Sequence, residues 1–160
     1  MTAFKRLMTF AAVAATVACL PALIVAKKPT EADGPPDLEA LSITIKSNCK
    51  SSPCKINNVS LSVGNNGGNA SNSRVEFYLS DDTVLTTATD EVTTVADTLL
   101  HSVSLGAVKA GKTKKRTLGG GHLKQASAAS GQYVIALVDS DNVLSETLES
   151  NNIVVSEPLP

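Results

Sequence analysis

Polar and apolar residues alternate along much of the chain beyond position 40. In residues 41–46, LSITIK, aliphatic side chains occupy every second position, and the same period of two recurs in residues 59–63 and 75–80. Strict alternation is typical of a β-strand that buries one face and exposes the other to water. Weaker patterns predict further strands at residues 99–108, 113–118, 132–138 and 153–156.

The segment QYVIALV, residues 132–138, is apolar on both faces and is therefore predicted to be the most central strand. Short polar turns rich in Gly, Asn and Asp separate the strands. A single helical turn is predicted at residues 123–130. About seven strands with short turns are typical of an all-β, antiparallel β-sandwich, although a small barrel produces the same pattern.

The first 26 residues have the pattern of a hydrophobic signal segment. Lys5 and Arg6 precede an uncharged stretch, and we expect cleavage after Ala26. Two alternatives stay open: an uncleaved anchor, because about 20 apolar residues span a bilayer, and a lipid-modified Cys19. All three export the remaining chain to the periplasm, the cell surface or the medium. The membrane is expected to be contacted only through this segment.

The exported part has three expected regions and a mildly acidic charge. Residues 27–36 form a Pro-rich linker, residues 37–156 the folded domain and residues 157–160 a tail. The chain has 160 residues, no Trp and five Phe and Tyr in total, which predicts one domain with an aliphatic core. Loss of Lys5 and Arg6 leaves 12 of the 14 basic residues against 15 acidic ones, or −3. This charge indicates no nucleic-acid partner.

Two cysteines remain after the leader, Cys49 and Cys54. An even pair in an exported chain favours a disulfide, which here would pin a local turn. A metal pair is the alternative, but the spacing is not that of a zinc motif and the chain has only two histidines.

Residues 106–113, GAVKAGKT, match the phosphate-binding loop pattern, with Gly106 and Thr113 at its ends. That loop requires a helix to begin at its lysine so that backbone amides face the phosphates. Here the chain continues as KKRTLGGGH, so we predict a hairpin turn with Gly111 at positive φ and no nucleotide partner. The basic residues of this segment have two possible roles. They either prevent an exposed strand edge from pairing with another chain, which we favour, or they bind a polyanion.

Acidic residues follow the predicted central strand. The run VDSDNVLSETLESNN spaces its oxygen ligands as a calcium loop does, but Val143, Leu144 and Ser150 stand where an EF-hand needs Asp or Asn, Gly and Glu. A polar turn is the better interpretation. Calcium nevertheless remains an alternative cofactor, and the candidate metal ligands are Asp139, Asp141, Asp81 and Asp90.

Catalytic chemistry has little support in the sequence. His101 and His122 belong to no recognisable nucleophile or zinc motif, and no G-x-S-x-G pattern is present. We therefore predict no catalytic residues. A small secreted hydrolase stays as a remote alternative.

The order of these patterns resembles the CARDB family, the cell-adhesion-related domain found in bacteria. Its opening matches Pro36-Asp37-Leu38, and its asparagine-glycine turn matches the turn at Asn65. Its closing motif matches Gly131, Tyr133, Asp139, Asn142, Val143, Glu146, Glu149, Asn151 and Asn152. The Cys49–Cys54 insert departs from the family pattern.

The resemblance implies an Ig-like β-sandwich that acts as a non-enzymatic binding or adhesion-type module at the bacterial cell envelope. Its expected partner is a protein or a glycan, and no cofactor is expected. The alternative is a calcium-dependent form of the same module, with ligands in the turn at Asp139 and Asp141 or in the loop from Asp81 to Asp90.

Overall fold

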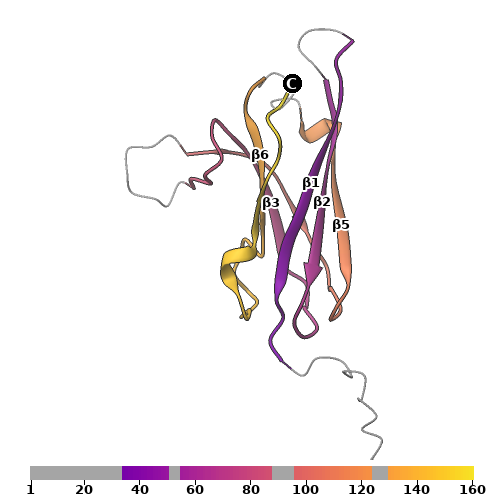
Figure 1. Ribbon diagram of the computed structural model, residues 1–160, viewed down its shortest axis with the longest axis vertical. Helices are drawn as coiled ribbons and strands as arrows, with labels where there is room; N and C mark the ends of the chain where they lie inside the picture. The colour runs from indigo at the N-terminus through magenta and orange to yellow at the C-terminus, as the bar shows by residue number, and fades with distance from the viewer. Residues whose placement is uncertain (1–33, 51–54, 88–95, 124–129) are drawn as a thin grey trace, which may run out of the picture.

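The computed structural model describes residues 34–50, 55–87, 96–123 and 130–160. Within these residues, seven strands form two antiparallel sheets packed face to face (Figure 1). One sheet has the order β1-β2-β5 and the other the order β4-β3-β6-β7. The strands are β1 (Leu38–Asn48), β2 (Lys55–Asn65), β3 (Arg74–Ser80), β4 (Thr98–Ser104), β5 (Thr113–Gly119), β6 (Tyr133–Val138) and β7 (Ile153–Val155). The predicted Ig-like sandwich is confirmed, and the barrel is excluded.

The core lies between the two sheets and is almost entirely aliphatic. Val59, Leu61 and Val63 alternate along β2 and face Val75 and Phe77 of β3, all of them fully buried. Burial of such a side chain contributes about 1.5–3 kcal/mol. Strand β6 lies between β3 and β7 in its sheet, as expected from a segment that is apolar on both faces.

The alternation predicted for β1 is only partly correct. The β1–β2 register breaks between Ala40 and Ser42, and the bulge turns Leu41 out of the core row, leaving it 47% exposed. Leu38 begins the inward-facing row instead and is fully buried. Leu41 packs over Gly64, where an added Cβ would lie 3.1 Å from its Cδ1.

Residues on both sides of the predicted domain, 37–156, take part in the fold. The backbone oxygens of Pro35 and Pro36 accept hydrogen bonds from Gly68 (2.9 Å) and from Thr147 (3.0 Å), so part of the predicted linker belongs to the fold. The predicted tail is also anchored. Leu159 is buried, and its amide donates to the Gln132 oxygen at 2.7 Å.

Three predicted segments differ in extent or fall outside the described part. Strand β4 ends at Ser104 rather than at residue 108, and a short 3-10 helix, η1 (Gly120–His122), follows β5. The helical turn predicted at 123–130 and the leader at 1–26, including Cys19, lie wholly or mainly outside the described residues. No helix in the described part of the chain is long and apolar enough to cross a bilayer.

Candidate functional site

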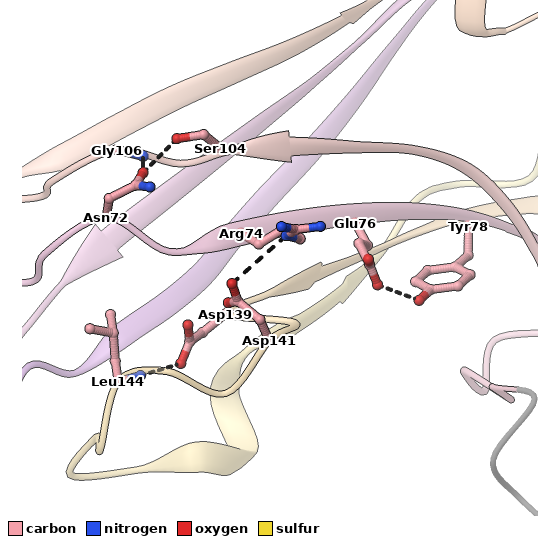
Figure 2. A network of polar contacts seen from close by, with 9 residues as sticks. All are labelled: Asn72, Arg74, Glu76, Tyr78, Ser104, Gly106, Asp139, Asp141 and Leu144. Carbon is pink, nitrogen blue, oxygen red and sulfur yellow. Dashed lines mark hydrogen bonds and ion pairs between the residues drawn. The ribbon is translucent and has the colours of Figure 1, made fainter.

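The acidic run after β6 folds as a tight turn. Hydrogen bonds to the backbone and to the side chain of Asp139 close this turn. Asp139 and Asn142 have positive φ angles, 50° and 48°, a conformation that Asp and Asn tolerate better than most residues. The Asn142 amide donates to the Asp139 backbone oxygen at 2.8 Å, and the Leu144 amide donates to Asp139 Oδ2 at 3.0 Å (Figure 2). The polar turn predicted here is present.

Glu146 joins this loop to the start of β1. Its Oε1 accepts the Leu38 amide at 2.9 Å, and its Oε2 accepts Asn152 Nδ2 at 2.6 Å. Glu149 Oε1 in turn accepts the Glu146 amide at 2.9 Å. Burial raises the pKa of Glu146, and the bonds from Asn152 and Leu38 oppose this shift.

Asn65 ties the other side of the β1 start to the neighbouring turns. Its Oδ1 accepts the amides of Asp37 and Gly67, both at 3.1 Å, and its Nδ2 donates to Gly68 at 2.6 Å and to Val108 at 2.8 Å. Asn65 is buried, so these bonds satisfy groups that water does not reach.

The closing motif therefore stabilises the fold at one end of the sandwich. We call this the motif end and define it as residues 35–38, 65–68 and 139–152. Asn151 Nδ2, in the short 3-10 helix η3 (Glu149–Asn151), adds a bond to Asp37 Oδ1 at 3.0 Å. Two family-motif residues lie outside the motif end: Gly131, a turn glycine with a φ of 85°, and Tyr133, which begins β6 and is half-buried.

The candidate calcium ligands do not gather at one point. Asp139 and Asp141 are neighbours, since the carboxylate of Asp141 contributes to the raised pKa of Asp139, and Asp141 also pairs with Arg74 at 3.7 Å (Figure 2). Asp81 lies at the opposite end of the β3–β6 ladder, about 17 Å away along the strands, and accepts a bond from Gln132. Asp90 lies outside the described residues.

Further observations concern possible metal ligands and the predicted disulfide. In the described residues, no group of three or more His, Cys, Asp or Glu side chains is placed to hold a metal ion. Burial raises the pKa of Asp139, whose Oδ1 is buried without a hydrogen-bond partner. Cys54 lies outside the described part of the chain, so the disulfide with Cys49 stays a prediction.

The glycine-lysine loop from Gly106 to Thr113 connects β4 to β5. Gly106 and Gly111 have positive φ angles of 68° and 65°, as expected of turn glycines. Thr113 begins a strand and not a helix, so the loop presents no helix N-terminus to a phosphate. Strand β5 is an edge strand, which agrees with the favoured role of its basic residues.

The outer faces of the two sheets differ in chemistry. The three-stranded sheet carries hydroxyl, amide and lysine side chains outward, such as Thr44, Ser60 and Thr117 in one row across the strands. The four-stranded sheet carries an apolar row in the equivalent place, formed by Leu99, Tyr78, Ile135 and Val155. None of these four belongs to the core between the sheets.

Two aliphatic side chains on this outer face are exposed, whereas Ile135 in the middle of the row is fully buried. Leu99 in the row is 49% exposed, and Ile153 on the same face is 47% exposed. We call Leu99, Tyr78, Ile135, Val155 and Ile153 the apolar face.

A polar region borders the apolar face. Tyr78 donates its hydroxyl to Glu76 Oε2 at 2.6 Å, and Arg74 lies further along β3 (Figure 2). A polar depression of about 280 Å³ continues toward the motif end, where Asn72 Oδ1 accepts the Gly106 amide at 2.7 Å. The depression is lined by Asn72, Ser73, Arg74, Ser102, Val103, Ser104 and Asp141.

Sequence reasoning missed the apolar face as a site. Its signal was the two-faced apolar pattern of QYVIALV, which indicated a central strand but also placed Ile135 on the outside of the sheet. The positions of Leu99 and Ile153 in the sequence did not indicate a shared surface, because only strand pairing places both on the same sheet face.

Comparison with protein families identifies the family of this chain. The CARDB family model matches residues 35–156. No curated protein matches the chain. Among solved structures, the crystal structure of the CARDB domain of a Pyrococcus furiosus protein, in complex with di-metal ions, is similar at 17% identity and a TM-score of 0.45, covering 76% of this chain and 90% of that chain.

CARDB domains are non-catalytic, adhesion-related β-sandwich modules that typically occur in extracellular bacterial proteins. The matched residues make up most of this sequence and include both the opening and the closing motif. The chain belongs to the CARDB family.

Proposed function

We propose that this chain is an exported, non-enzymatic binding module that contacts a protein at the bacterial cell envelope through the apolar face of its four-stranded sheet. The observation that carries the proposal is the contrast between the two outer faces. A sheet face in contact with water alone has no need of exposed aliphatic side chains such as Leu99 and Ile153 beside the buried Tyr78 and Ile135.

The surroundings of the apolar face match the anatomy of a protein interface. Such interfaces combine a small apolar centre with a polar rim, and a few anchors supply most of the binding energy. Leu99 and Ile153 are the exposed aliphatic anchors, and Glu76, Ser102 and Arg74 supply the rim.

A protein partner fits this face better than a glycan does. Sugar rings are commonly bound by stacking on exposed aromatic side chains. On this sheet Phe77 points into the core, Tyr78 is only 9% exposed with its hydroxyl bonded to Glu76, and Tyr133, on the same face as Ile135, is half-buried. Aliphatic anchors suit apolar side chains of a protein.

Capture from a cell-envelope extract tests the proposal. Wild-type protein is immobilised beside Leu99→Ser, Ile153→Ser and the double variant, with Leu41→Ser as a control. Leu41 and Ile153 are equally exposed, at 47%, but lie on different sheets. We expect the double variant to lose at least about tenfold in affinity for the captured protein, while the control keeps it.

Two results would count against this face or this partner class. Equal capture by the double variant and the wild type would show that the apolar face is not the binding surface. Retention of purified envelope glycan, with equal strength in all variants, would replace the protein by a glycan.

Export is part of the same proposal and is tested separately. The mass of the protein recovered from producing cells distinguishes an N-terminus at Lys27, a lipid-modified Cys19 and an intact leader. Recovery of the full-length chain from the cytosol alone would contradict export.

A calcium-dependent form is the second candidate, favoured by one observation at the motif end. Asp139 Oδ1 is buried without a partner, next to the carboxylate of Asp141. A hard cation prefers such oxygens and would offset their repulsion. We expect millimolar calcium to raise the unfolding temperature of the wild type but not of Asp139→Asn. An unchanged melting curve in the wild type would remove this candidate.

A further inference from the structure

Strand β1 is the longest free edge of the sandwich. It has 11 residues, whereas the other strands at sheet edges, β4, β5 and β7, have 7, 7 and 3. Within the described residues, β2 is the one strand that pairs with β1. Every second residue of β1 therefore directs its backbone N–H and C=O away from the sheet, where a further strand can bind them.

Strand β1 lacks the protection that two other edges have. Strand β5 carries three consecutive cations, residues 114–116, and β7 is very short; charge and shortness both prevent an edge from pairing with another chain. The charged residues of β1 are Glu39 and Lys46, which have opposite signs and lie near its two ends. An edge of this kind repels a strand of uniform charge but accepts one with the complementary order of charges.

The side chains of β1 alternate between the core side and the outer side of the sheet. Ala40, Ile43 and Ile45 pack against the core. Leu41 is the extra residue of the bulge and is skipped in the pairing with β2. The residues that alternate with the core-side row lie on the outer side of the sheet: Glu39, Ser42, Thr44 and Lys46.

An apolar groove of about 390 Å³ lies beside this edge. Ile43 and Ile45 line it from β1 and are only half-buried, although both pack against the core. The C-terminal segment contributes Glu157, Pro158 and Pro160 to the opposite wall. A strand added to β1 with apolar side chains on its core side would cover this groove.

We propose that β1 pairs in antiparallel orientation with β1 of a second copy of this chain, with the twofold axis at Ile43. On the core side of the joined sheet, Ile43 then faces its own counterpart, and Ala40 faces Ile45 of the second copy. On the outer side, hydroxyl faces hydroxyl and charge faces charge: Ser42 lies opposite Thr44, and Glu39 opposite Lys46, of the second copy.

The order of charges along β1 favours a second copy as the occupant. Glu39, Ile43 and Lys46 pair with residues 64, 61 and 58 of β2, so both charges lie three ladder positions from Ile43. A twofold axis at Ile43 therefore brings opposite charges together at both ends. A shift of the register that keeps apolar residues on the core side moves the two charges apart.

Both charges are available for this pairing. The ion pair found among the described residues joins Arg74 to Asp141, so neither Glu39 nor Lys46 takes part in one there. Glu39 accepts one hydrogen bond, from Asn66 to its Oε2, which leaves Oε1 for a cation. Lys46 is exposed.

The pairing goes beyond the proposed function and does not depend on it, because β1 belongs to the sheet that does not carry the apolar face. Core-side residues lie opposite core-side residues, so the four-stranded sheets of both copies lie on the same side of the joined sheet. The dimer thus presents two apolar faces to one side. A surface with repeated partners would be bound with avidity.

Sedimentation equilibrium from micromolar to millimolar concentration tests the dimer, using the chain as recovered from producing cells. Lys46→Glu places like charges at both ends and is expected to weaken the dimer at least about tenfold. Adding Glu39→Lys restores opposite charges and should return the affinity to within about threefold of the wild type. Lys115→Glu, an exposed lysine on β5 of the same sheet, is the matched control and should leave the affinity unchanged.

Two sedimentation results would overturn the proposal. One is a wild-type chain that stays monomeric at every concentration. The other is association that Lys46→Glu and Lys115→Glu change equally, which would place the contact elsewhere on the molecule.

Cysteine cross-linking tests the register itself. Facing residues of an antiparallel pair have Cα atoms about 4.5–5.5 Å apart, within reach of a disulfide. Ile43→Cys should therefore form a covalent dimer on mild oxidation, beyond any formed by the wild type with its native cysteines. Thr117→Cys, exposed on β5, is the control and should not.

A second pair of variants decides the matter if Ile43→Cys fails to fold. Ser42→Cys and Thr44→Cys replace exposed residues, and their mixture should cross-link more than either variant alone. Equal cross-linking in the mixture, the separate variants and Thr117→Cys would contradict the twofold axis at Ile43.

Discussion

The motif end and the apolar face use their side chains in opposite ways. At the motif end, Asn65, Glu146 and Asn151 turn inward and bind backbone or side-chain groups of the same chain. On the apolar face, Leu99 and Ile153 turn outward and bind nothing within the described structure. The residues that identify the family therefore hold the fold together. The surface suited to a partner lies almost entirely outside the motif, so family membership alone does not indicate the ligand.

The comparison predicts that motif-end substitutions damage stability first, and Asn65→Ala tests this most strongly. The change removes four hydrogen bonds from a buried site and leaves backbone groups without partners. We expect a loss of about 3–4 kcal/mol in the free energy of unfolding, measured by urea denaturation.

Asn66→Ala is the matched control for Asn65→Ala. Asn66 is the next residue, is exposed, and its side chain donates one bond to Glu39 at 2.8 Å. Its loss is expected to change stability by less than about 0.5 kcal/mol. Similar losses for both variants would show that the buried network around Asn65 is not what holds the motif end.

Two different substitutions of Glu146 test how much its hydrogen bonds contribute to the stability of the motif end. Glu146→Ala leaves the Leu38 amide and Asn152 Nδ2 without their acceptor, which should cost about 2–3 kcal/mol. Glu146→Gln should cost less than about 1 kcal/mol, because Asn152 can flip and offer its unpartnered Oδ1 to the new amide. Chemical denaturation of both variants measures the difference, and equal losses would contradict the flip.

Titration of the motif end should also appear in the pH dependence of stability. Burial raises the pKa of Asp139 and of Glu146, so the folded state holds their protons more tightly than the unfolded state. Their contribution to stability is therefore full in acid and falls as pH rises from about 4 through the raised pKa values. Melting between mild acid and neutrality should show this fall, reduced in Glu146→Gln. An unchanged slope in that variant would exclude Glu146 as its source.

The smallest effect concerns Tyr78 on the apolar face. Burial, followed by the hydrogen bond to Glu76, raises the pKa of the Tyr78 phenol from 10.0 to about 12. Ultraviolet titration of the phenolate should show this late ionisation. Glu76→Gln should lower the pKa only partly, because burial is the larger cause. A full return to 10.0 would show that Glu76, and not a closed apolar surface, protects the ring.

The sequence was sufficient for the fold wherever a strand buries one regular face. Val59, Leu61 and Val63 follow the period of two, and the structure places all three in the core. The turn at Asp139 was also predictable, since Asp and Asn favour backbone conformations that other residues avoid.

Other features depend on contacts between distant segments and could not be predicted locally. Leu41 fits the alternating pattern but is turned outward by a bulge that only the pairing with β2 reveals. The stacking of His101 on His122 depends on how the two sheets are juxtaposed. The apolar face arises from the order β4-β3-β6-β7, which nothing in the individual strands specifies.

The hydrogen bonds of Asp37 and of the residues next to it also determine how the domain carries mechanical load. The chain enters the sandwich at the motif end, and Pro160 lies at the opposite end (Figure 1). Tension on the segment before Pro35 acts along β1 and loads the whole β1–β2 ladder in shear, so its bonds break together rather than one by one. The bonds that Gly68 and Thr147 donate to Pro35 and Pro36 are the first to bear that force, followed by those between Asp37 and the side chains of Asn65 and Asn151. The motif end is thus the point through which the fold would resist a pull from its N-terminal side.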